Sequence, residues 1–214
     1  MLPREVAGIF LPNTPLALAA AEYARDTCPA FLFNHCMRTF LFGAVAMTHH
    51  KVNYNVEDAF IAASLHDLGL IQSLASTDRS FELDGANLAS QFARSIGATE
   101  GDSEEIWWAV ALHDGRFSMV ERRGGDAMLV AMGAGSDVMG PDADMIDSRR
   151  SAEIVSAFPR LGFKNKFTTL LIEHCRRKPL AQRGTWLEGL CREQAPGVWS
   201  KTIEDQITQA PFSE

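Results

Sequence analysis

A histidine and an aspartate stand side by side at residues 66 and 67, after an apolar run and just before a glycine. The run AFIAASL is typical of a buried helix, where side chains that prefer water need a bonding partner. A neutral imidazole and a carboxylate together suit Zn, Fe, Mn or Ni. Successive helical residues point about 100° apart, so His66 and Asp67 could flank a cation at the helix end. Two ligands do not make a metal site, and the others must come from elsewhere in the chain.

Two residues in other apolar segments could complete such a site. His35 lies in FLFNHCMRTFLFG, where a buried imidazole needs a hydrogen-bond or metal partner. Asp137 lies in VAMGAGSDVMG, where an isolated buried carboxylate would neutralise or seek a cation. Taken singly, a packed core histidine and a helix-capping aspartate are the simpler interpretations of these two residues.

The segments that carry these residues are predicted to be helices, because apolar residues recur at intervals of three and four. The fold class predicted is therefore all-α. Asn55 is a predicted N-cap, Asp102 or Ser103 another, and Gly69 is expected to end its helix. The glycines in residues 124–140 predict close packing against a neighbour. Helices are expected over residues 15–27, 29–50, 56–67, 82–96, 103–114, 124–140, 149–158, 165–177 and 184–193.

Composition and charge narrow the classes of protein. The chain has 214 residues, of which 46% are hydrophobic and 22% charged. We therefore expect one domain over 1–214, with a core at about 28–175 on which an N-terminal arm and a C-terminal helix pack. A net charge of −7 disfavours nucleic acid as a partner and favours a small-molecule substrate. No membrane partner and a cytoplasmic location are expected, and a homodimer is left open.

Four cysteines are scattered along the chain without a CxxC pair or a short Cys/His cluster. This spacing predicts neither a zinc knuckle nor a redox pair. We expect all four to be reduced thiols that pack in the core: Cys28, Cys36, Cys175 and Cys191.

The order of the candidate ligands, His, then His-Asp, then Asp, resembles the HD-domain superfamily of metal-dependent hydrolases. The matching motifs are NHCMR with His35, SLHDLG with His66 and Asp67, and GSDVMG with Asp137. The segments AASLHDLGL, FELDGANLASQF, IWWAVALHD and SAFPRLGFKNKF are similar to the cyanamide hydratase-like branch. The likeness covers roughly residues 30 to 170.

The resemblance implies an HD-domain helical bundle in which these four side chains hold one divalent transition metal ion. Zinc is the first expectation, with Fe, Mn or Ni as alternatives. Metal-bound hydroxide would attack a nitrile-type carbon, which makes the chain a hydratase of a small molecule. One alternative is an HD phosphohydrolase of nucleotides or phosphate esters. Another is a metal-stabilised binding module without turnover.

A second adjacent pair, His113 and Asp114, ends the predicted helix IWWAVALHD. His113 continues the apolar face of that helix, so we expect it near the metal as a group that hydrogen-bonds substrate or water. A packed core histidine is the alternative. Asp114 is expected to be solvated at the helix end.

Other candidates for catalysis and substrate binding surround the metal ligands in sequence. Asp67 is expected to act at the metal during catalysis, and Glu82 as a proton shuttle, although a carboxylate in a first helical turn also suits the helix dipole. Arg38, one turn after His35, is predicted either to bind substrate or to pair with a buried carboxylate. Trp108 is predicted to wall the pocket.

The two enzyme hypotheses differ in the charge that they require. A phosphohydrolase needs cationic groups around the phosphate, and apart from Arg38 and the 149–166 region the relevant segments offer few. A hydratase needs an apolar cup, which the Phe-, Trp- and Met-rich segments suit. The sequence leaves both hypotheses open.

Overall fold

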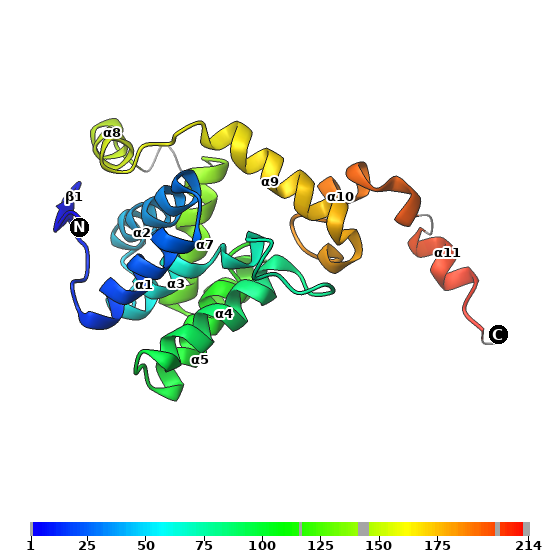
Figure 1. Cartoon of the computed structure of the whole chain (residues 1–214), viewed down its shortest axis with the longest axis horizontal. Helices are drawn as coiled ribbons and strands as arrows, with labels where there is room; N and C mark the ends of the chain where they lie inside the picture. The colour runs from blue at the N-terminus through cyan, green and yellow to red at the C-terminus, as the bar shows by residue number, and fades with distance from the viewer. Residues whose placement is uncertain (1, 116, 141–145, 200–201, 212–214) are drawn as a thin grey trace.

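The structure is a computed structural model and describes residues 2–115, 117–140, 146–199 and 202–211. It is an all-α bundle with one small hairpin, which confirms the predicted all-α fold class (Figure 1). The elements are β1 (Glu5–Val6), β2 (Ile9–Phe10), α1 (Pro15–Thr27), α2 (Ala30–His50), α3 (Val56–Leu65), η1 (Leu68–Leu70), α4 (Phe81–Ser95), α5 (Glu100–Ala111), α6 (Phe117–Arg123), α7 (Gly125–Val138), α8 (Ser148–Ala157), α9 (Phe163–Arg177), η3 (Pro179–Gln182), α10 (Glu188–Gln194), η4 (Pro196–Val198) and α11 (Ile203–Thr208).

Helix α2 is the central element of the bundle. Its side chains are buried almost continuously from Leu32 to Met47, because it packs against α3, α7 and the N-terminal part of the chain. By length and composition this helix could cross a membrane, but 83% of its apolar stretch is buried inside the protein. A helix that is apolar all round and covered by other helices is a core helix.

Helix α7 packs directly against α2, as its glycines predicted. A β-carbon on Gly133 would lie 1.9 Å from the carbonyl oxygen of Thr39, and one on Gly43 would lie 2.3 Å from that of Leu129. Only residues without a side chain allow the two backbones to come so close. This contact places the last turn of α7, with Asp137, beside His35 in the second turn of α2.

The turn that carries the His-Asp pair follows α3. Asn55 caps α3 as predicted, by accepting hydrogen bonds from the amides of Glu57 and Asp58. The prediction that Gly69 ends this helix is wrong: α3 ends at Leu65, and Gly69 lies within η1. A β-carbon on Gly69 would lie 2.0 Å from the carbonyl oxygen of Phe81, so this glycine is needed for the contact between η1 and α4.

Helix α5 begins earlier than predicted. Its N-cap is Thr99, which forms a capping box with Asp102, so the prediction of Asp102 or Ser103 as the cap is wrong. In the capping box the side chain of each residue accepts a hydrogen bond from the backbone amide of the other, so two amides at the helix start are satisfied. A helix that began at Asp102 or Ser103 would lack these two bonds. The helix ends at Ala111, and His113 therefore lies in the turn that follows it. The hairpin β1–β2 and the helices α6 and α11 had no counterpart among the predicted elements.

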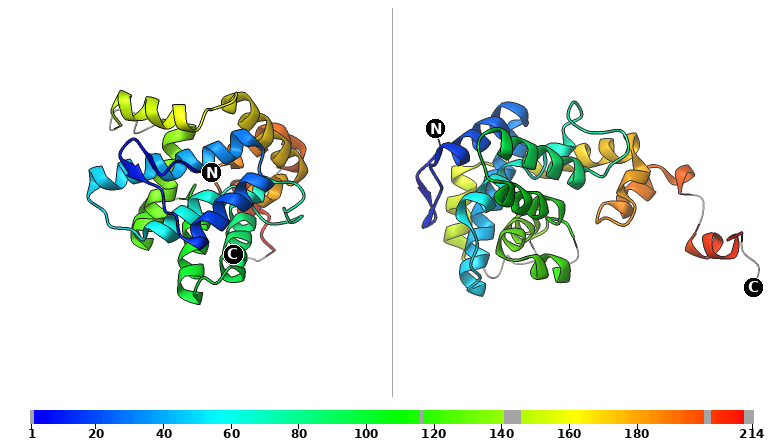
Figure 2. Two further views of the ribbon diagram at one scale, coloured as in Figure 1. Left: turned by 60° about the vertical axis from the view of Figure 1, so that its left-hand side comes forward. Right: turned by 90° about the horizontal axis from the view of Figure 1, so that it is seen from below.

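From α9 onward the chain forms an arm that extends from the bundle through α10, with α11 standing farther out (Figures 1 and 2). Cys175 and Cys191 are joined by a disulfide, so the prediction of four reduced thiols is wrong for this pair. The tertiary contact between α9 and α10 brings the two sulfurs together, and their spacing in sequence does not signal it. Cys28 and Cys36 are free and buried, and burial raises the pKa of Cys28 to about 12.

Candidate metal site and active-site pocket

Three of the predicted ligands meet at one point inside the bundle. Nε2 of His35 lies 3.3 Å from Nε2 of His66, and both lie close to Oδ2 of Asp67, at 3.5 and 3.4 Å. Ligands about 2.0–2.1 Å from a tetrahedral metal are separated by about 3.4 Å. The three atoms are therefore spaced as ligands of a single ion, and all three side chains are buried.

The hydrogen bonds of the two imidazoles direct their free nitrogens toward this point. Nδ1 of His66 donates to the carbonyl oxygen of Ala63, and Nδ1 of His35 donates to Oδ2 of Asp137. In the neutral ring the opposite nitrogen then carries a lone pair. Burial, opposed by Asp67 and reinforced by the neighbouring imidazoles, lowers the pKa of His66 to about 3, which keeps it neutral.

This arrangement fits a cation. The two Nε2 atoms face each other at 3.3 Å without a hydrogen to share, and Oδ2 of Asp67 is buried without a hydrogen-bond partner among the described residues. Lone pairs and a buried carboxylate oxygen that point at one spot are stabilised by a positive charge there. His35, His66 and Asp67 can therefore hold a divalent metal, whose identity the donor set does not specify.

Asp137 stands behind His35 in this structure and is not one of the three converging atoms. Its carboxylate accepts from Nδ1 of His35 at 2.7 Å, from Arg38 at 2.7 and 2.8 Å, and from Arg160 at 2.6 Å. Burial alone would raise its pKa, but the bonds from His35 and Arg38 hold the pKa well below its usual range. The structure thus places Asp137 as an ionised acceptor that orients His35, which differs from the predicted role as a fourth ligand.

Arg38 makes an ion pair and does not reach the pocket. It is fully buried, its guanidinium binds Asp137 through Nε and Nη2, and Nη1 donates to the carbonyl oxygen of Phe158. Of the two predicted roles for Arg38, the structure has the pairing with a buried carboxylate, and the substrate-binding role is contradicted. Its position one turn after His35 directs it to the same partner.

His113 lies on the open side of the three ligands. Its Nδ1 donates to the carbonyl oxygen of Val110, so Nε2 carries a lone pair, and this atom lies 3.9 Å from Oδ1 of Asp67. The ring packs edge-on against His66 and Phe81. His113 is therefore beside the predicted metal position, as expected, and its role in catalysis or substrate binding stays a prediction.

The buried Glu82 and the half-buried Asp114 are neighbouring carboxyl groups next to His113. Both oxygens of Glu82 and Oδ2 of Asp114 are buried without a hydrogen-bond partner among the described residues. Burial, and then the neighbouring Asp114, raise the pKa of Glu82 to about 9, so Glu82 is protonated at neutral pH. The expectation that Asp114 is solvated is wrong, because the turn after α5 folds its side chain inward toward α4.

His35, His66, Asp67, His113 and Asp114 line a pocket of about 520 Å³. A volume of this size accommodates a small molecule. Apart from the site residues, its wall is largely apolar, and none of the lining residues within the described ranges is Lys or Arg. The lining residues are His35, His50, His66, Asp67, Phe81, His113, Asp114, Gly115, Phe117, Val120, Ala131, Met132, Ala134, Gly135, Val138, Met139, Phe167 and Trp186.

Two residues predicted for this pocket lie outside its lining. Trp108 is on the outer side of α5, where Arg123 packs over its ring and Trp107 contacts it edge-on. The prediction that Trp108 walls the pocket is contradicted, because the buried face of α5 is the one that carries Ile106 and Val110. Glu82 also lies behind the wall and reaches the pocket only through Asp114.

Sequence reasoning missed three residues that belong to this region. Arg160 binds Asp137 with a second guanidinium, and Phe167 and Trp186 line the pocket. Phe167 had a detectable signal, since it lies on the apolar face of a predicted helix. Arg160 follows a proline in a connection, and Trp186 lies in a turn, so neither position had a periodic pattern.

Comparison with known proteins agrees with this geometry. Residues 32–119 match the HD domain family, in agreement with the predicted superfamily. The matched segment contains His35, His66, Asp67 and His113.

Two proteins of Saccharomyces cerevisiae are similar along most of the chain. Cyanamide hydratase DDI2 and cyanamide hydratase DDI3 are each 22% identical to it over 186 residues, which are 83% of this chain and 80% of each relative. They are consistent with the cyanamide hydratase-like branch. The HD domain, the relatives and the ligand cluster together support a metal-dependent hydrolase-type function.

Proposed function

We propose that the protein hydrates a small nitrile-type substrate at the pocket, with one divalent metal ion held by His35, His66 and Asp67. The observation that carries the proposal is this ligand cluster in the lining of an apolar pocket. The names of the two yeast relatives support the same chemistry. Zinc is the metal that we propose first.

The absence of cationic side chains among the described lining residues favours a nitrile over a phosphate ester. Phosphoryl transfer depends on positive groups that stabilise charge on the phosphate oxygens. Arg38 and Arg160, the nearest described guanidiniums to the cluster, are engaged with Asp137. A nitrile needs only a narrow apolar approach to the reacting carbon, and the aromatic and Met side chains of the wall suit it.

In the proposed reaction, the oxygen of water bonds to the nitrile carbon and one of its protons passes to the nitrile nitrogen, which gives an amide after tautomerisation. The metal, when bound, lowers the pKa of water toward about 7. His113 accepts the proton of the attacking water at Nε2, because its Nδ1 is already committed to Val110. Glu82, which is protonated at neutral pH, supplies the proton for the nitrile nitrogen by way of Asp114, which lines the pocket.

A parallel assay tests the proposal. Purified protein would be loaded with zinc, iron or manganese and given cyanamide, small aliphatic and aromatic nitriles, nucleoside monophosphates and a generic phosphodiester. We expect amide or urea formation and no phosphate release. Phosphate release alone would establish the phosphohydrolase alternative, and metal binding without turnover of any compound would favour the non-catalytic binding module.

Metal analysis tests the site itself. Asp67→Ala should reduce the bound metal to a small fraction of the wild-type stoichiometry, because it removes one of three ligands and the only anionic one. Trp108→Ala, outside the pocket lining, is the matched control and should retain metal. Equal metal content in Asp67→Ala and wild type would refute the assignment.

A further inference from the structure

One aromatic side chain of the pocket comes from the C-terminal arm, outside the matched HD domain. Trp186 lines the pocket, yet it lies in the turn between η3 and α10. Its side chain is 44% exposed, which leaves a large apolar ring in water at the pocket wall. Phe117 and Met139 line the same pocket and are also exposed, at 57% and 61%. Three exposed apolar side chains around one opening form a surface that a ligand can cover.

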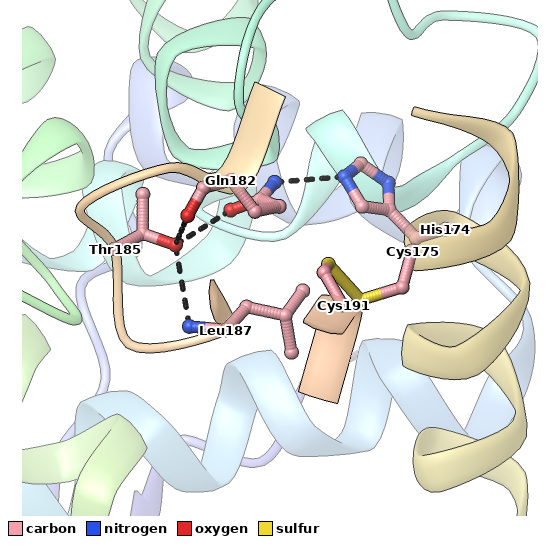
Figure 3. Close-up of a disulfide and its surroundings, with 6 residues drawn as sticks. All are labelled: His174, Cys175, Gln182, Thr185, Leu187 and Cys191. Atoms are coloured by element: carbon pink, nitrogen blue, oxygen red, sulfur yellow. Dashed lines mark hydrogen bonds between the residues drawn. A yellow bond between two sulfur atoms is a disulfide. The ribbon is translucent and has the colours of Figure 1, made fainter. Parts of the chain in front are cut away.

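The turn that carries Trp186 is held by a buried polar network, drawn in Figure 3. Gln182, fully buried, donates from Nε2 to Nε2 of His174 at 2.8 Å and accepts from the hydroxyl of Thr185 at 2.8 Å. The same hydroxyl accepts from the amide of Leu187 at 3.2 Å. Burial, and then Lys178 and Arg177, lower the pKa of His174 to about 4, so its ring is neutral and can accept. Trp186 thus stands between two residues that the network orders.

Covalent and ionic links attach this turn to the rest of the molecule. The Cys175–Cys191 disulfide joins α9, which precedes the turn, to α10, which follows it (Figure 3). Lys178, at the end of α9, forms a buried ion pair of 2.7 Å with Asp84 on α4. The ion pair of Lys178 precedes Trp186 in the chain, and the disulfide at Cys191 follows it. The position of the indole therefore depends on both.

We propose that Trp186 is a specificity-determining residue that packs against the apolar part of the substrate at the pocket mouth, and that the Cys175–Cys191 disulfide positions it there. The proposal rests on the proposed function, which supplies both the pocket as the substrate site and the nitrile as the reacting group. The substrate class that it specifies is a nitrile with an apolar tail, for which the pocket has room beyond the reacting group. Cyanamide, which has no such tail, does not reach the indole.

A substitution series tests the contact. In Trp186→Ala, kcat/KM for benzonitrile should fall about tenfold, mainly through a higher KM, since one aromatic packing partner is lost. For cyanamide the change should stay within about twofold, because the ligands of the metal are untouched. Leu180→Ala removes an equally exposed apolar side chain of the same arm, outside the pocket lining, and should change neither value. Equal losses with both substrates, or no loss with benzonitrile, would overturn the proposal.

A second measurement does not require turnover. The four tryptophans would be labelled with 5-fluorotryptophan, and Trp186→Phe would assign the resonance of Trp186. Benzamide, the hydration product of benzonitrile, should shift this resonance in the wild type. In Cys175→Ser/Cys191→Ser the resonance should move before ligand is added, and benzamide should bind at least fivefold more weakly.

The kinetic measurement and the fluorine NMR measurement distinguish the possible failures. A protein that hydrates no nitrile but shows the benzamide shift refutes the proposed reaction and keeps Trp186 as a binding residue. If benzamide does not shift the Trp186 resonance, the specificity role is refuted, whether or not the protein hydrates nitriles. A resonance and a benzamide affinity that are the same in the double serine variant and in the wild type refute positioning by the disulfide.

Discussion

His35, His66 and Asp67 present their ligand atoms to one point, and each histidine is fixed there by a bond on its far nitrogen. For His66 the acceptor is a backbone carbonyl of its own helix, whereas for His35 it is Asp137 from α7. A carboxylate that accepts from the far nitrogen of a ligating histidine holds the ring in position and raises its basicity. The arginines on Asp137 keep that carboxylate ionised.

The orienting role of Asp137 leads to a prediction at the residue scale. Asp137→Asn preserves the shape of the side chain but weakens the acceptor for His35, so zinc affinity should fall about 10- to 100-fold. Competition with a chromophoric chelator would measure it, with circular dichroism as the control for folding. A complete loss of metal, as in Asp67→Ala, would instead identify Asp137 as a direct ligand.

A buried carboxyl far from the metal predicts how stability depends on pH. Asp58 is 5% exposed at the start of α3, and burial, followed by the charges of Asp102, Asp126, Glu57 and Glu105, raises its pKa to about 7. Between the usual pKa of 3.8 and the raised pKa of about 7 the folded state therefore binds more protons than the unfolded state at this group. Its contribution to stability is then lost as the pH rises through that window.

Asp58→Asn should remove this dependence, since the amide is neutral and its oxygen can still accept from Asn55. The unfolding midpoint of the wild type should fall more between pH 5 and pH 8 than that of the variant. Thermal denaturation of both proteins in matched buffers measures the difference. Parallel curves would show that Asp58 titrates as an ordinary exposed carboxyl.

At the scale of elements, the packing of α7 on α2 decides where Asp137 lies. Gly133 and Gly43 allow the two backbones to touch, and a one-turn shift of α7 would take Asp137 away from His35. Helix α9 then covers the other side of His35, with Phe163 stacked on the ring at a centroid distance of 4.8 Å. The ligand cluster is therefore a product of helix packing as much as of its own residues.

Two glycines of α7 test this packing with opposite expected signs. In Gly133→Ala the new β-carbon would meet the carbonyl oxygen of Thr39 at 1.9 Å, so the variant should lose about 1–3 kcal/mol or more of stability. Gly135 has no atom within 4 Å of the corresponding position, so Gly135→Ala should gain up to about 1 kcal/mol from helix propensity. Denaturant unfolding measures both, and similar effects at the two positions would contradict the packing argument.

At the scale of the whole molecule, the metal ligands connect elements that are distant in the chain. His35 is in the second turn of α2, whereas His66 and Asp67 lie between α3 and η1. A metal that binds only when these elements are assembled stabilises the entire bundle by mass action, by about 4 kcal/mol when free metal is a thousand times its dissociation constant.

Zinc should therefore raise the melting temperature of the wild type by several degrees, to an extent that depends on metal concentration. Scanning calorimetry at increasing free zinc would show it. The same titration of Asp67→Ala should give little or no shift, and His50→Ala, a pocket residue outside the ligand cluster, should behave as the wild type. A zinc shift of full size in Asp67→Ala would place the stabilising ion elsewhere.

The sequence by itself determined the helical fold, the central apolar helix and the residues that could ligate a metal. These follow from local rules: the 3.6-residue period, the cap at Asn55, and side-chain types that bind cations. They are expressed within one or two helical turns, so no tertiary information is needed to find them.

Only the tertiary structure decided how Asp137, Arg38, Asp114, Trp108 and the Cys175–Cys191 pair are used. Each assignment depends on a contact between segments far apart in sequence, such as α2 with α7 or α9 with α10. A side chain that lies at the edge of a helical face can turn to the core, to a partner or to solvent with little change in its local pattern. The direction that the side chain takes depends on which segment packs beside it, and the packing of the whole bundle determines that segment.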